Sequence, residues 1–100
     1  MINLEKYTND IKQLCEKHKV KSLYAFGSVL TDNFNHNSDI DFIVDFKPLD
    51  LPEYADNYYN LKYALENVVH RQVDLLEEKA IKNPYFKQAV KDKRQLVYGY

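Results

Sequence analysis

The chain has 100 residues, of which 45% are hydrophobic, and this suits one domain with a single core over residues 1–100. Its formal net charge of −1 gives no general positive field, so direct binding to nucleic acid or to anionic lipid is not expected. One cysteine excludes an intrachain disulfide, and without a signal peptide or an apolar run that could span a bilayer we expect a cytoplasmic protein.

The first predicted element is an amphipathic helix from Leu4 to Lys19. Apolar residues recur there at helical spacing, and Asn3 is a suitable N-cap. Cys15 is expected to be a small core hydrophobe and His18 a satisfied residue at the core edge. A strand from Val20 to Phe26 is expected to follow.

Gly27 ends this strand and is one of only two glycines in the chain. Glycine permits a tight turn there and lets a ligand approach the backbone closely. Ser28 is expected to begin a short helix at Val29-Leu30, and residues 31–38 are predicted to be a polar loop. Backbone N–H groups at such a strand-to-helix turn bind phosphate, and the Ser28 hydroxyl could add a contact.

A second strand is predicted from Asp39 to Phe46, and its two faces differ in character. One face carries Ile40, Phe42, Val44 and Phe46, and the other carries Asp39, Asp41, Ile43 and Asp45. Asp39 and Asp41 lie about 7 Å apart on one face. Their carboxylates repel each other there, and a divalent cation between them would remove that repulsion.

The remaining elements alternate helix and strand. A helix is predicted to begin at a capping box formed by Asp50 and Glu53 and to end near Val69. Gln72 to Leu76 is predicted to be a third strand and carries Asp74, and residues 77–82 a connecting helical turn. The last helix is predicted to begin at Asn83-Pro84, with Phe86, Val90, Arg94 and Val97 on one face. His36, His70 and Arg71 are expected to face solvent.

This order of elements predicts an α/β (α+β) fold, with helices packed on a small mixed sheet of three or four strands. Asp39, Asp41 and Asp74 can then meet at one edge of the sheet if their strands are neighbours. Oxygen ligands alone suit Mg²⁺ or Mn²⁺, and two such ions can clamp the attacking and leaving oxygens of a phosphoryl transfer. Neither a P-loop motif nor a Rossmann fingerprint is present.

Gly27-Ser28, ten intervening residues and then Asp39-Ile40-Asp41 resemble the GSx₁₀DxD signature of the DNA polymerase β-like nucleotidyltransferase superfamily. The short length, together with Val73-Asp74-Leu75, points to its minimal nucleotidyltransferase (MNT) branch and to MntA-type antitoxins of HEPN/MNT toxin–antitoxin pairs. The resemblance covers about Val20 to Tyr98, which is most of the chain.

This resemblance implies a role for each matching residue. Asp39 and Asp41 would hold Mg²⁺ or Mn²⁺ with a nucleoside triphosphate, which the resemblance implies to be ATP. Asp74 would complete the metal site and help to deprotonate the acceptor hydroxyl, while Gly27 and Ser28 would bind the β and γ phosphates. The acceptor would be a tyrosine of a HEPN-domain toxin, which the protein would neutralise by transferring AMP to it.

Two other functions remain open. The branch often carries Arg and Gly after the Gly-Ser pair, and here Val29, Leu30, Thr31 and Asp32 follow instead. A catalytically weak or inactive antitoxin that neutralises its partner by binding alone is therefore the first alternative. The second is a small-molecule nucleotidyltransferase of the antibiotic-modifying kind, although such enzymes usually need a further domain for the acceptor.

Overall fold

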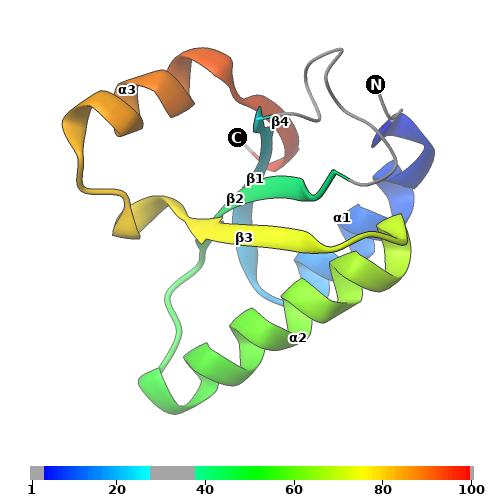
Figure 1. The fold of residues 1–100 in the computed structure, drawn as a ribbon. Coiled ribbons are helices and arrows are strands. Elements are labelled where there is room, and N and C mark those ends of the chain that lie inside the picture. Colours follow the sequence, from blue (N-terminus) through cyan, green and yellow to red (C-terminus); the bar gives the residue numbers. More distant parts are fainter. Residues whose placement is uncertain (1–3, 28–37, 100) are drawn as a thin grey trace.

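The computed structural model describes residues 4–27 and 38–99, and this part of the chain forms three α-helices and one four-stranded sheet (Figure 1). The elements in chain order are η1 (Leu4–Tyr7), α1 (Thr8–Lys17), β1 (Val20–Phe26), β2 (Ile40–Phe46), α2 (Leu51–Val69), β3 (Val73–Glu77), η3 (Glu78–Ala80), α3 (Pro84–Lys93) and β4 (Gln95–Gly99). Ser28, the predicted short helix after it and the predicted loop as far as residue 37 lie outside the described residues. No helix in the described part is long and apolar enough to cross a membrane.

The sheet is mixed and has the strand order β3-β2-β1-β4. β1 pairs antiparallel with both β2 and β4, whereas β2 and β3 are parallel and are joined through α2. A parallel pair needs such a long crossover, because its strands cannot be joined by a tight turn. The predicted α+β class with a small mixed sheet is confirmed.

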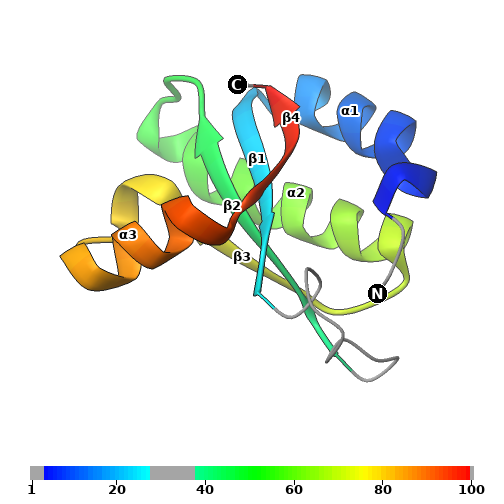
Figure 2. The same ribbon diagram turned by 90° about the horizontal axis from the view of Figure 1, so that it is seen from above.

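Helices α1 and α2 lie side by side on one face of the sheet, as Figure 2 shows from above. Alternate residues of β2 point into this layer, as predicted, and all four of them are buried. They join one cluster with Ile11 and Cys15 of α1 and Leu61 and Leu65 of α2. The core therefore lies between the sheet and these two helices, and it leaves the opposite face of β2 available for polar side chains.

Side chains of α2 also cover the outer edge of β3. The Tyr58 hydroxyl donates a hydrogen bond to the Leu75 carbonyl, and the Val73 N–H donates to Glu66 Oε2 at 2.9 Å. Unpaired backbone groups along an edge strand can pair with another chain. These two bonds satisfy part of that edge and fix α2 against the strand that carries Asp74.

The C-terminal segment differs from the prediction. α3 ends at Lys93, and Gln95–Gly99 forms β4 where helix had been expected as far as Val97. Residues 95–99 instead pair with the free edge of β1, for example Leu96 with Tyr24. Sheet pairing along this edge outweighs the weak helical pattern of a short terminal segment.

Helix starts were predicted with mixed success. Asn83 caps α3 as predicted, because its Oδ1 accepts hydrogen bonds from Tyr85 N and Phe86 N at 2.9 and 3.1 Å. The predicted capping box of α2 is wrong: Asp50 is the N-cap residue, but its side chain makes no capping bond. Its backbone carbonyl accepts from the Glu53 and Tyr54 N–H groups instead.

Candidate active site

Asp41 and Asp74 face each other across the parallel strands β2 and β3. Their Cα atoms are direct partners in the register, so both side chains lie on the same face of the sheet. Asp39 precedes β2, which begins one residue later than predicted, and its side chain is exposed. The register thus places Asp41 opposite Asp74, whereas Asp39 lies outside the paired residues, and its convergence with them stays a prediction.

The neighbouring carboxylates affect the pKa of Asp41. Burial of its carboxyl, followed by the like charges of Asp74 and then Asp39, raises the pKa of Asp41 above its ordinary value. All three causes disfavour the charged carboxylate, and a positive group brought to the site would offset this effect.

Gly27 brings backbone directly against this carboxylate. It follows β1, in which Phe26 is the partner of Asp41, and its φ of +81° favours glycine. A Cβ added to Gly27 would lie 2.6 Å from Asp41 Oδ2, which is closer than Cβ atoms come to other atoms. The backbone conformation therefore favours glycine at this position, and a residue with a Cβ would have to displace the Asp41 carboxylate.

Tyr58 was not predicted as part of this region. Burial, then the charge of Asp74 and then Tyr59, raise the pKa of the Tyr58 hydroxyl. Its bond to the Leu75 carbonyl holds the ring beside the residue that follows Asp74. Its position at the helical spacing of α2 indicated core packing, and nothing in the sequence indicated contact with the acidic strand.

Arg71 corrects a prediction. It was expected to face solvent, but it is half-buried, and its Nη1 donates a hydrogen bond to the Ser38 carbonyl at 3.0 Å. Ser38 immediately precedes Asp39, so an arginine reaches the start of the acidic segment from the turn between α2 and β3. His70 is exposed, as expected, and ends α2 in a left-handed conformation with φ of 56°.

The donor set suits a hard divalent cation, because Asp39, Asp41 and Asp74 offer only carboxylate oxygens. Within residues 4–27 and 38–99, however, no three His, Cys, Asp or Glu side chains are arranged closely enough to form a ready metal site. The three carboxylates are neighbours that repel one another. A bound cation would have to draw them together.

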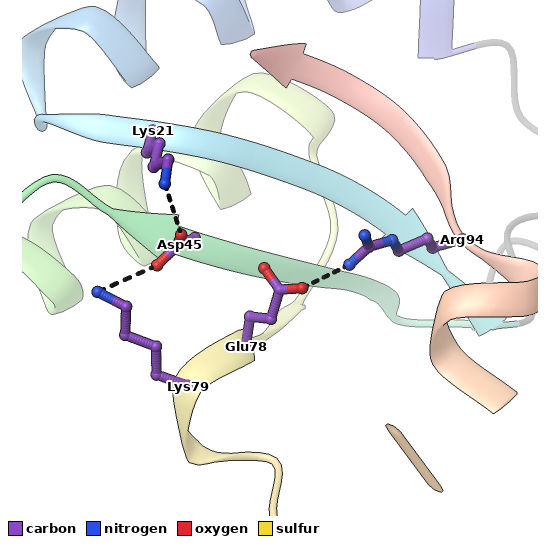
Figure 3. Close-up of polar contacts among 5 residues, drawn as sticks. All are labelled: Lys21, Asp45, Glu78, Lys79 and Arg94. Atoms are coloured by element: carbon purple, nitrogen blue, oxygen red, sulfur yellow. Dashed lines mark hydrogen bonds and ion pairs between the residues drawn. The ribbon is translucent and has the colours of Figure 1, made fainter. Parts of the chain in front are cut away.

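The opposite end of β2 carries a different arrangement of charge (Figure 3). Asp45 Oδ1 lies 3.6 Å from Lys79 Nζ, and Oδ2 lies 4.0 Å from Lys21 Nζ. These are ion pairs too long to be hydrogen bonds, so the buried Oδ1 has no hydrogen-bond partner. Glu77 is close by: burial raises the pKa of its carboxyl, Lys79 lowers it, and Asp45 raises it.

Arg94 belongs to the structural framework. Its Nη1 lies 2.7 Å from Glu78 Oε1 in an ion pair drawn in Figure 3, and its guanidinium stacks 3.8 Å from the centre of the Tyr24 ring. Nearby, the Phe26 and Phe86 rings meet edge to face at 6.0 Å. These contacts attach α3 and the start of β4 to β1.

Comparison with known proteins identifies the family. Residues 10–97 match the family model described as the nucleotidyltransferase domain. The chain belongs to this family. The predicted membership is thereby confirmed, and the match extends over almost all of the described elements.

Named relatives agree with this assignment. Two candidate protein adenylyltransferases of Methanocaldococcus jannaschii, MJ1379 and MJ0128, are 37% and 38% identical to this chain over 87 residues. Each alignment covers 87% of this chain and 84% of the relative.

Solved structures share the fold. A candidate minimal nucleotidyltransferase superposes with a TM-score of 0.76 at 25% identity, over 91% of this chain and 89% of the other. A toxin–antitoxin structure with AMP-PNP gives 0.71 at 25% identity, over 93% and 73%. A tri-AMPylated Shewanella oneidensis HEPN toxin in complex with its MNT antitoxin gives 0.65 at 22% identity, over 98% and 74%, which shows likeness of fold alone.

Proposed function

We propose that this nucleotidyltransferase is a metal-dependent protein adenylyltransferase that transfers AMP from ATP to a tyrosine hydroxyl of a HEPN-type toxin and so acts as its antitoxin. The observation that supports this most strongly is the pairing of Asp41 with Asp74 across β2 and β3, with the Gly27 backbone against Asp41. Two like charges that face each other across strands cost stability, whereas binding of a metal-bound triphosphate gives them a function.

The similar proteins support the choice of substrate. The relatives from M. jannaschii are named for adenylyl transfer to protein, and one structural neighbour of this chain was solved with AMP-PNP. A further neighbour is an MNT antitoxin in complex with a HEPN toxin that carries AMP. We therefore assign ATP as the donor and a HEPN-domain protein as the acceptor.

Each residue of the site then has a task. Asp39 and Asp41 would hold Mg²⁺ or Mn²⁺, which neutralises the triphosphate, and Gly27 and Ser28 would bind the departing phosphates. Asp74 would help to take the proton from the acceptor hydroxyl. The hydroxyl oxygen forms a bond to the α-phosphorus while the bond from that phosphorus to pyrophosphate breaks, so AMP stays on the acceptor and pyrophosphate leaves.

A masking function is the alternative, and a specific observation favours it. Val29, Leu30, Thr31 and Asp32 replace the Arg and Gly that often follow the Gly-Ser pair in this branch. An antitoxin of this kind would bind its toxin tightly without modifying it. The small-molecule nucleotidyltransferase remains a third reading, although such enzymes usually need a further domain for the acceptor.

Co-expression with the HEPN-type partner separates these functions. The partner should gain the mass of one or more AMP groups in intact mass spectrometry with the wild-type protein, and no added mass with Asp39→Ala combined with Asp41→Ala. The double variant should still co-purify with the partner, since the substitutions remove charge and not surface. An unmodified partner in a tight complex with both proteins would favour masking and contradict the transferase.

A further inference from the structure

We infer that Arg71 is a positioning residue: with its turn, it fixes Asp39 relative to Asp74 and so sets the affinity of the site for a metal-bound nucleotide. This inference rests on the proposed function and deepens it. The resemblance to the family assigned roles to the three acids and to Gly27-Ser28, but none to the turn between α2 and β3.

The first support is that the residues on both sides of Asp39 are hydrogen-bonded to the same turn. The residue before it, Ser38, accepts a hydrogen bond from Arg71 Nη1 at 3.0 Å. The residue after it, Ile40, donates its N–H to the Gln72 carbonyl at 3.1 Å. Both bonds lead to consecutive residues of one turn, so the backbone on each side of Asp39 is attached to the same place.

The second support is that this turn is itself fixed to α2. The His70 N–H donates to the Glu66 carbonyl at 2.9 Å and closes the last helical turn. The Glu66 side chain then accepts the Val73 N–H at 2.9 Å. Asp74 is the next residue. One short segment therefore carries Asp74 on its own strand and holds Asp39 on the neighbouring one.

An arginine suits this position for a chemical reason. Its guanidinium stays charged at every relevant pH and offers several donors in a rigid plane, so it can hold a carbonyl while bringing positive charge to an acidic region. The chain contains only two arginines, and Arg94 is bound to Glu78 at the end of α3. Arg71 is thus the arginine that contacts the acidic segment.

The test compares wild type with Arg71→Met and uses Arg94→Met as the matched control, because each variant removes one half-buried arginine and one charge. Mn²⁺ is titrated into each protein with α,β-methylene ATP, and free Mn²⁺ is followed by electron paramagnetic resonance. Loss of an outer hydrogen-bond partner weakens metal binding by about 10- to 100-fold, and we expect this for Arg71→Met. Arg94→Met should bind as the wild type does. Equal binding by wild type and Arg71→Met would overturn the inference.

Hydrogen exchange of the metal-free proteins gives a second measurement, which does not depend on nucleotide. The Ile40 and Asp41 amides should lose protection in Arg71→Met, while those of Ala25 and Leu65 keep theirs. If Arg71→Met does not fold, Arg71→Lys takes its place, since it keeps the charge but loses the planar donor group. A wild type that binds no Mn²⁺–nucleotide would contradict the proposed function. Hydrogen exchange would then still test whether Arg71 holds the backbone beside Asp39. Unchanged protection of the Ile40 amide in Arg71→Met would contradict that role.

Discussion

The two ends of β2 place a carboxylate on the same face of the same strand, in opposite surroundings. Asp45 lies between Lys21 and Lys79, at ion-pair distance from both. Asp41, four residues earlier, has its pKa raised by burial and by two other carboxylates. Among the described residues, the Asp45 end of the strand therefore has lysines at ion-pair distance, and the Asp41 end has no ion pair.

This difference distinguishes a carboxylate that stabilises the fold, Asp45, from one that we expect to serve function, Asp41. Lysines are available throughout the chain, which contains 14 Lys and Arg residues in total, so an ion pair at Asp41 would have been easy to provide. Proteins keep unfavourable charge arrangements where function needs them, at some cost in stability. We infer that the end of β2 with Asp41, the acidic end, binds a cation that arrives with the nucleotide. The end with Asp45, the lysine-paired end, is part of the structural framework.

The largest effect on nucleotide binding is expected when Gly27 is changed to Ala. A positive φ costs a residue with a Cβ about 1–2 kcal/mol in free energy of unfolding. The new Cβ would also displace Asp41 Oδ2, from which it would lie 2.6 Å away. We expect urea unfolding to show this loss and calorimetry to show no binding of Mg²⁺ with nucleotide.

Gly99→Ala is the control for this prediction. Gly99 also has a positive φ, of +84°, but its added Cβ would meet the Lys21 carbonyl at 2.1 Å, away from the acids. This variant should lose stability and keep nucleotide binding. Binding that survives in Gly27→Ala would contradict the role given to the contact between Gly27 and Asp41.

The next effect concerns Asp41→Asn in metal-free buffer. The pKa of Asp41 is raised in the fold, so the folded protein holds this proton more tightly than the unfolded chain. Ionisation of Asp41 lowers the free energy of unfolding. This loss is absent below the ordinary carboxyl pKa of about 3.9 and is complete above the raised pKa. Removing one cross-strand repulsion should stabilise the protein by about 0.5 kcal/mol at pH 7. The gain should disappear at pH 3, and thermal unfolding at both pH values measures it. An equal gain at pH 3 and pH 7, or no gain at pH 7, would contradict the prediction.

The smallest effect is expected at the other end of the strand, for Asp45→Asn. Both lysines are largely exposed, so losing the two ion pairs should cost no more than about 0.5 kcal/mol. High salt should reduce that loss, because it screens exposed charges. If Asp45→Asn instead raises stability as Asp41→Asn does, the two ends of β2 do not differ in the way described here.

Much of the fold could be predicted because its elements have strong local patterns. The alternation of β2 and the apolar spacing of α2 identified the core faces, and Asn83-Pro84 identified the start of α3. β4 was missed because its pairing partner, β1, is about 70 residues away in the sequence, and such a contact leaves no local pattern. The capping box at Asp50 failed because a suitable sequence does not oblige the side chain to turn toward the helix.

The site was predictable to the extent that its residues interrupt apolar strands. Asp41 and Asp74 stood out because charge is costly there, and the parallel register places them face to face. Arg71 could not be recognised in the same way, since a basic residue after a helix is ordinary in any sequence. Only the fold brings it to the Ser38 carbonyl. Ser28 remains a prediction, because it lies outside the described residues.

Titration calorimetry with Mg²⁺ and α,β-methylene ATP tests the central claim most directly, with wild type, Asp41→Asn and Asp45→Asn as the three proteins. We predict that wild type and Asp45→Asn bind the nucleotide alike, and that Asp41→Asn does not bind it although it is folded and at least as stable. Equal binding by all three proteins, or none by the folded wild type, would contradict the claim that the acidic end of β2 receives a metal-bound nucleotide.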